Sequence, residues 1–153
     1  MRGAQCCEES LAYSGKLFLS APWCSLRSSL GSTEVEGVEG PFDFTSAEID
    51  AKVLPRRIGS YVLGKTRADG SFNVRYVGRS DADLNIELKK RLTLGYPAFK
   101  FQYVDSSKDA FIRESKNYHF VGGKAVLDNE RHPDRPDGMN NLKCPVPGCT
   151  ELQ

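Results

Sequence analysis

The amino-acid sequence predicts an α+β fold: a small three-stranded, mainly antiparallel sheet flanked by helices. Three segments, 58–63, 72–77 and 99–104, are rich in the β-branched and aromatic residues of strands, and the last two alternate apolar and polar residues. Two segments with helix-capping residues and helical spacing follow the second and third of these strands. This order favours antiparallel pairing of neighbouring strands, with helices packed on the sheet.

The first two strands are expected to form a hairpin. The connection Arg67-Ala-Asp-Gly70 contains an Asp-Gly turn signal. In the second strand Phe72, Val74 and Tyr76 alternate with other residues, which predicts that these three side chains share one face.

The two helices of the domain have recognisable ends. Ser80 or Asp81 is expected to cap the first helix, and Gly95 to end it. The second is expected to begin at the capping box 106–109 and to stop at Gly122-Gly123. Residues 129–149 contain four prolines and several Asp, Asn and Gly residues, which predicts an irregular segment.

The sequence divides into an acidic N-terminal extension, residues 1–55, and a basic domain, residues 56–149. The extension has four Lys and Arg against eight Asp and Glu, and its Gly- and Glu-rich stretch 31–40 is typical of a linker. We expect it to be partly disordered, with a short helix near 45–54 that Pro55 ends. The domain has seventeen Lys and Arg against eleven Asp and Glu, a balance of +6 that suits a nucleic-acid partner although the whole chain carries only +1.

Cysteine usage and hydropathy indicate an intracellular, cytoplasmic protein without a membrane partner. The five cysteines are an odd number and do not form a dense disulfide framework. Glu8 and Glu9 stand where a signal peptide carries basic residues. No apolar run approaches the roughly 18 residues that a membrane helix needs.

A set of spaced motifs runs through the basic domain. Gly59-Ser-Tyr61 on the first strand and Tyr76-Val-Gly78 on the second are followed by Asp83-Leu84 at a helix start, Glu114 inside the second helix and Asn129 beyond it. Over about residues 57–149 this order resembles a divergent member of the GIY-YIG nuclease family. The resemblance implies a small α+β nuclease domain that hydrolyses DNA phosphodiester bonds with a divalent metal ion.

The resemblance also implies roles for individual residues. Tyr61 would activate or orient the attacking water, Tyr76 would assist at the phosphate, and Asn129 would position the tyrosines. Glu114 would bind a single Mg²⁺ or Mn²⁺ ion. From residue types alone, the two tyrosines are better explained as packed aromatics of a sheet, and Asn129 as a turn residue.

Glu114 stands out even without the resemblance. It lies three residues after Phe111 and four before Tyr118, so it is directed along the apolar stripe of its helix. A carboxylate there needs an ion pair, a metal ion or a cleft. A Glu at the edge of the stripe that reaches solvent is the alternative.

One residue departs from the family pattern. The family carries an arginine three residues after the Asp-Leu pair, where this chain has Glu87. A carboxylate would repel the charge that develops on a scissile phosphate. Arg91, one helical turn further on, and Arg79, next to the second tyrosine motif, are possible substitutes. The departure motivates a second hypothesis, a catalytically inactive nucleic-acid-binding module on the same scaffold.

A third hypothesis is a small zinc-stapled interaction domain in which the tyrosines only pack. His119, His132, Cys144 and Cys149 are residue types that zinc accepts. Their spacing argues against a zinc site, because four residues separate the cysteines and the histidines are thirteen positions apart. His119 is better explained as a helix-end residue that packs near the Gly-Gly stop.

Overall fold

The computed structural model describes residues 37–152 of the 153-residue chain. Most of the predicted N-terminal disorder, the first part of the expected linker and three of the five cysteines fall outside these residues. Within the described part, no helix is long and apolar enough to cross a membrane.

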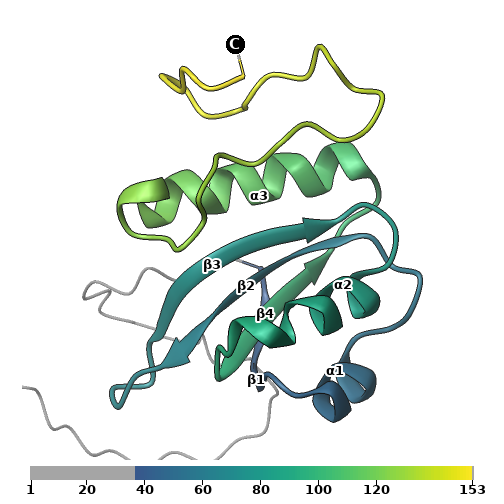
Figure 1. The fold of residues 1–153 in the computed structure, drawn as a ribbon, viewed down its shortest axis with the longest axis vertical. Helices are drawn as coiled ribbons and strands as arrows, with labels where there is room; N and C mark the ends of the chain where they lie inside the picture. The colour runs from purple at the N-terminus through teal and green to yellow at the C-terminus, as the bar shows by residue number, and fades with distance from the viewer. Residues whose placement is uncertain (1–36, 153) are drawn as a thin grey trace, which may run out of the picture.

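The centre of the fold is an antiparallel sheet with the strand order β1-β4-β2-β3 (Figure 1). Its strands are β1 (Glu39–Asp43), β2 (Gly59–Thr66), β3 (Phe72–Ser80) and β4 (Ala98–Tyr103). The α+β class is confirmed, but the sheet has four strands and the prediction of three was wrong. The missed strand, β1, lies at the edge and pairs only with β4, and its sequence EGPFD does not alternate.

Helices cover both faces of this sheet. They are α1 (Ser46–Lys52), α2 (Leu84–Lys90) and α3 (Ser107–Val121), with short 3₁₀ turns η1 (Arg91–Leu94) and η2 (Gly123–Ala125). In Figure 1, α1 and α2 lie on one side of the sheet and α3 on the other. The predicted caps at Thr45 and Ser106 are confirmed. The cap of α2 is Asp83, not Ser80 or Asp81, because β3 continues to Ser80.

Two apolar cores result from this arrangement. The first joins α1 and α2 to the sheet and includes Ile49, Leu84, Leu88, Phe99 and Phe101, all fully buried. Residues 39–53, which the sequence places in the N-terminal extension, therefore contribute a strand and a helix to the same sheet and core. The second core lies under α3 and is built from Val62, Phe72, Val74, Val77, Ala98, Tyr118 and Leu127.

A β-bulge in the hairpin decides which core each side chain enters. Leu63 of β2 pairs with Tyr76, but the next residue, Gly64, pairs with Val74, so β3 has one extra residue at Arg75. Val74 consequently packs in the α3 core, whereas Tyr76 packs against the α1/α2 core. The prediction that Phe72, Val74 and Tyr76 share a face was wrong for this reason.

After η2 the chain is irregular, as predicted: residues 126–152 contain neither helix nor strand. This segment first passes the edge of β3 and then folds back along α3 (Figure 1). Its course brings residues 128–134 beside the end of β3, where a cleft forms.

Candidate active-site cleft and a His/Cys cluster

A cleft of about 880 Å³ lies at the edge strand β3, between α2, α3 and the segment 128–134. Its lining contains all six residues that the sequence singles out, namely Tyr61, Tyr76, Arg79, Arg91, Glu114 and Asn129. They come from two strands, two helical segments and the C-terminal segment, so only the tertiary fold brings them together.

The two tyrosines are neighbours across the hairpin. Their ring centroids are 6.4 Å apart and nearly parallel, at 24°. Tyr61 pairs across the sheet with Gly78, and a Cβ atom on Gly78 would lie 2.4 Å from the Tyr61 hydroxyl oxygen. Gly78 is therefore required so that the Tyr61 ring can extend across β3 to the cleft. Burial raises the pKa of Tyr61 well above its usual range, so its hydroxyl stays protonated.

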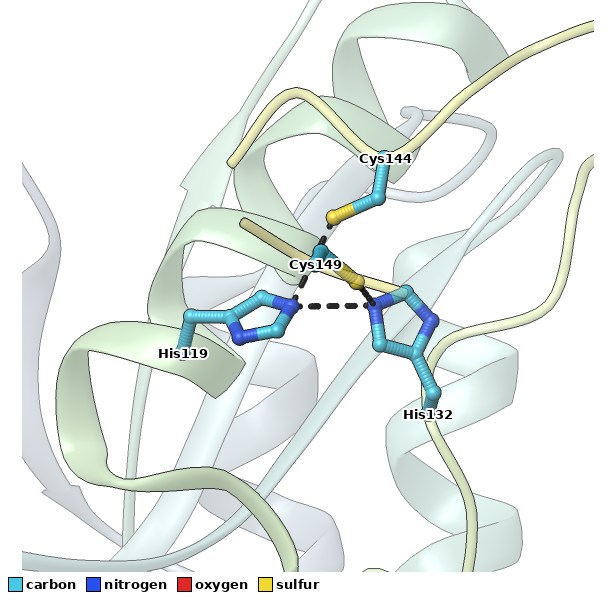
Figure 2. A group of neighbouring side chains, drawn as sticks. All are labelled: His119, His132, Cys144 and Cys149. Atoms are coloured by element: carbon cyan, nitrogen blue, oxygen red, sulfur yellow. Dashed lines mark hydrogen bonds between the residues drawn. The ribbon is translucent and has the colours of Figure 1, made fainter. Parts of the chain in front are cut away.

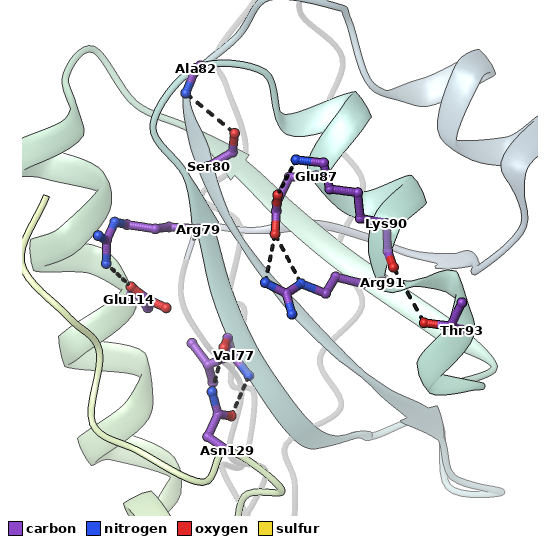
Figure 3. A network of polar contacts seen from close by, with 10 residues as sticks. All are labelled: Val77, Arg79, Ser80, Ala82, Glu87, Lys90, Arg91, Thr93, Glu114 and Asn129. Atoms are coloured by element: carbon purple, nitrogen blue, oxygen red, sulfur yellow. Dashed lines mark hydrogen bonds and ion pairs between the residues drawn. The ribbon is translucent and has the colours of Figure 1, made fainter. Parts of the chain in front are cut away.

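Arg91 reaches the cleft from the turn that follows α2. Its guanidinium lies 5.8 Å from the centroid of the Tyr76 ring. Glu87, on the preceding helical turn, accepts from it at 2.8 Å (Nη2) and 3.0 Å (Nε), and also pairs with Lys90 at 3.4 Å (Figure 3). Glu87, the residue that departs from the GIY-YIG pattern, therefore has its charge neutralised by Lys90 and Arg91, one helical turn further on.

Arg79 and Glu114 form an ion pair on the other side of β3 (Figure 3). Arg79 Nη1 donates to Glu114 Oε2 at 2.6 Å, and Arg79 Nε donates to Asp81 Oδ1 at 3.0 Å. The Glu114 side chain is only 10% exposed. Burial raises the pKa of Glu114 to about 7, an effect that Arg79 partly offsets and that the carboxylates of Asp81 and Asp134 reinforce.

Asn129 holds the C-terminal segment against β3. Its Oδ1 accepts from the Val77 N–H at 3.0 Å, and its Nδ2 donates to the Val77 carbonyl at 2.8 Å (Figure 3). Val77 lies between Tyr76 and Gly78, so Asn129 satisfies free backbone groups of the edge strand within the tyrosine motif.

The charge of the cleft differs from that of the domain. Its lining has four cationic side chains, those of Arg79, Lys90, Arg91 and Arg131. Seven carboxylates face them, those of Asp81, Asp83, Glu87, Glu114, Asp128, Glu130 and Asp134. Such a cleft attracts a divalent cation more readily than a bare phosphate.

A second cluster of reactive side chains, drawn in Figure 2, adjoins the cleft through His132, which also lines it. His119 Nε2 and His132 Nε2 are 3.1 Å apart, Cys144 Sγ is 3.5 Å from His119 Nε2, and Cys149 Sγ is 3.5 Å from His132 Nε2. All four ligand atoms lie within 4.8 Å of one another, so these residues could hold a metal ion. The four side chains converge although their spacing in the sequence is not that of a common zinc motif, because folding brings the two histidines together.

Sequence reasoning missed several residues of the cleft wall. Asp128 pairs with Arg75 and accepts from the Tyr96 hydroxyl at 2.8 Å, next to Asn129. Asp81 and Asp134 lie close enough to Glu114 to influence its pKa. No local pattern marks these residues. The partners of Asp128 are 32 and 53 positions away, and Asp81 and Asp134 are 33 and 20 positions from Glu114.

Comparisons of the chain with protein-family models, with curated proteins and with solved structures found no match.

Proposed function

We propose that the chain is a divalent-metal-dependent endonuclease that hydrolyses DNA phosphodiester bonds in the cleft at β3. The observation that carries the proposal is the meeting of Tyr61, Tyr76 and Arg91 with the buried Glu114 in one cleft. Hydroxyls can orient water, a guanidinium can bind phosphate, and a carboxylate can hold a metal ion, which are three roles that serve the hydrolysis of a phosphodiester.

The tyrosines act as hydrogen-bonding groups in this proposal. Because Tyr61 stays protonated, it orients the attacking water rather than removing a proton as a tyrosinate. Tyr76 is half-buried beside it and faces the cleft with Arg91 over its ring, so the two can contact the same phosphate. Arg91 supplies the positive charge that the family arginine would provide.

Glu114 would hold Mg²⁺ or Mn²⁺, with Asp81 as a nearby second carboxylate. The residues fit such an ion, since Mg²⁺ binds through one or two carboxylates and completes its coordination with waters and phosphate oxygens. A bound ion would supply Lewis-acid activation of the phosphate and of a water molecule. Arg79 keeps Glu114 oriented, and Asp81 offers Arg79 a second partner.

DNA is the proposed partner because of the distribution of charge around the cleft. Thirteen of the seventeen Lys and Arg residues of 56–149 lie outside the lining of the cleft. In this proposal these outer cations attract the phosphate backbone, and the metal ion compensates for the acidic lining where one phosphate enters.

The experiment is a cleavage assay with supercoiled, nicked and branched DNA in Mg²⁺, in Mn²⁺ and in chelator. We expect the wild-type chain to cleave at least one substrate only when a divalent metal is present, and Glu114→Ala to abolish the activity. Glu48→Ala removes a partly exposed carboxylate on α1, outside the cleft, and should cleave like wild type. Activity that Glu114→Ala leaves unchanged would contradict the proposal.

A second candidate is a nucleic-acid-binding module that does not cleave. The observation that favours it is the pairing of Arg91 with Glu87, which neutralises the charge that the phosphate needs. This candidate predicts salt-sensitive DNA binding without metal-dependent cleavage. Gain of cleavage in Glu87→Arg would support it, and cleavage by the wild-type chain would exclude it.

A further inference from the structure

The His/Cys cluster has the composition and the dimensions of a metal site that the proposed cleavage reaction does not use. We propose that His119, His132, Cys144 and Cys149 bind one structural Zn²⁺ ion. The site stands on its own geometry and does not depend on the nuclease proposal. Two nitrogens and two sulfurs form a ligand set that closed structural zinc sites use.

The distances match a tetrahedral ion. Zn–N bonds of about 2.0 Å and Zn–S bonds of about 2.3 Å place two nitrogen ligands about 3.3 Å apart and a nitrogen and a sulfur about 3.5 Å apart. The corresponding distances in the cluster are 3.1 Å between the two Nε2 atoms and 3.5 Å for each of two Sγ–Nε2 pairs. The four atoms therefore need little movement to surround one ion.

The surroundings orient the ligands toward a common centre. His132 Nδ1 lies 2.9 Å from the Pro133 carbonyl, which selects the tautomer with a proton on Nδ1 and a free lone pair on Nε2. The Tyr118 ring packs edge-on against both imidazoles, with centroid distances of 5.4 Å. Figure 2 shows the histidine Nε2 atoms and the sulfur atoms directed at one another.

The site is also balanced in charge. Two thiolates and two neutral imidazoles cancel the charge of Zn²⁺, so the loaded site can stay buried at little electrostatic cost. Cys149 is buried and the other three residues are partly buried. All four positions would be filled by protein, which makes the ion structural rather than catalytic.

The ion would tie three parts of the chain together. His119 lies on α3, five residues after Glu114, whereas His132 belongs to the cleft wall, and the two cysteines belong to the irregular tail. Zinc would therefore fix the segment 129–134 to the helix that carries Glu114. This segment has no helix or strand to make it rigid, and such a cross-link would supply that rigidity.

The direct test is the metal content of the full chain, purified without a polyhistidine tag. We expect one zinc per chain, and we expect Co²⁺ added to the zinc-free chain to bind with the visible d–d bands of a tetrahedral site and a thiolate charge-transfer band. Less than stoichiometric zinc together with no tetrahedral Co²⁺ spectrum would overturn the proposal. So would a Cys144–Cys149 disulfide, detected by mass spectrometry of the alkylated chain.

Variants assign the ligands. Cys144→Ser and Cys149→Ser should each lose zinc, whereas Cys24→Ser, a cysteine outside the described residues, should retain it. If the variants do not fold, the Co²⁺ titration of the wild-type chain decides the question. Glu114→Ala should keep its zinc. This variant therefore separates a loss of cleavage in the cleft from a loss of metal at the His/Cys cluster. Zinc retained by the double variant of Cys144 and Cys149 would contradict the assignment.

Hydrogen exchange tests the connection to the cleft. Removal of zinc from the wild-type chain should speed amide exchange in residues 129–150 and leave β2 and β4 protected. Unchanged exchange in 129–134 after zinc removal would contradict the proposed tie between the ion and the cleft wall.

Discussion

Arg79 donates to Glu114 across 2.6 Å, and both side chains are nearly buried, at 13% and 10% exposure. The pair joins the end of β3 to the middle of α3 and so lines one side of the cleft. Without this partner the buried Glu114 carboxylate would lack its paired cation, which destabilises a fold. Arg79 is thus a positioning residue for Glu114.

Arg79→Ala should destabilise the fold by about 2 kcal/mol, because it removes a hydrogen-bonded charge partner from a buried carboxylate. Glu114→Gln should restore most of the stability in the double variant, since the remaining side chain carries no charge. Denaturant unfolding of the wild-type chain, both single variants and the double variant measures the coupling. Additive losses in the double variant would contradict the role given to the pair.

Tyr61→Phe should keep the fold but lose cleavage. The Tyr61 ring packs in the α1/α2 core and against Gly78, and phenylalanine retains that packing while removing only the hydroxyl. Tyr103→Phe is the matched control, because the Tyr103 hydroxyl accepts from the Leu54 N–H at 2.7 Å outside the cleft. Thermal unfolding and cleavage rate, measured on both variants, separate the two effects. Full cleavage activity in Tyr61→Phe would show that the Tyr61 hydroxyl takes no part in the reaction.

Asn129→Ala should lower the free energy of unfolding by about 1–3 kcal/mol, because it leaves two backbone groups of Val77 without their partners. The exchange rate of the Val77 amide should rise as well. Asn140→Ala, an exposed position in the same irregular segment, is the control and should change neither quantity. An unchanged Val77 amide in Asn129→Ala would show that the C-terminal segment does not depend on this contact.

Asp83 makes stability depend on pH at the start of α2. Burial acts to raise its pKa, but the N–H groups of Arg56 and Ile86, which donate to the carboxylate at 2.8 and 3.2 Å, outweigh it and hold the pKa below the ordinary 3.8. The stabilisation is therefore complete above about pH 5 and is lost as the pH falls through the lowered pKa.

Asp83→Ala should lower the free energy of unfolding by about 1 kcal/mol at pH 7, as loss of a helix cap usually does. This difference in stability from wild type should shrink as the pH falls below 3.8. Asp83→Asn keeps a capping oxygen without the charge, so its difference from Asp83→Ala should not vary with pH. Urea unfolding at pH 7 and pH 3 measures both. If the difference in unfolding free energy between wild type and Asp83→Ala grew on acidification, the role given to the Asp83 carboxylate would be contradicted.

The elements that could be predicted from the sequence are those with local signals. Ser106 with Asp109 and the glycine pair at 122–123 mark α3 because capping depends on neighbouring residues. The strand β1 and the bulge at Arg75 have no such signal. The strand β1 depends on pairing with β4, far away in the sequence, and the bulge depends on the register of the β2–β3 hairpin.

The candidate site divides in the same way. The tyrosine motifs could be found because a hairpin keeps their partners close in sequence. The four residues of the His/Cys cluster could not be grouped by spacing, since one histidine lies on α3 and the other three residues lie on a segment that folds back over that helix. The acidic lining of the cleft was equally hidden, because net charge per domain does not reveal which charges converge.

The most direct test of the nuclease account is the rate at which the wild-type chain and Glu114→Gln cleave the same supercoiled plasmid in Mg²⁺. The account predicts metal-dependent cleavage by wild type and a rate at least about a hundredfold lower in the variant, which corresponds to about 3 kcal/mol of lost transition-state stabilisation. Thermal unfolding must show that the variant is folded under the same conditions. Equal rates for the two chains, or wild-type cleavage that persists in chelator, would contradict the account.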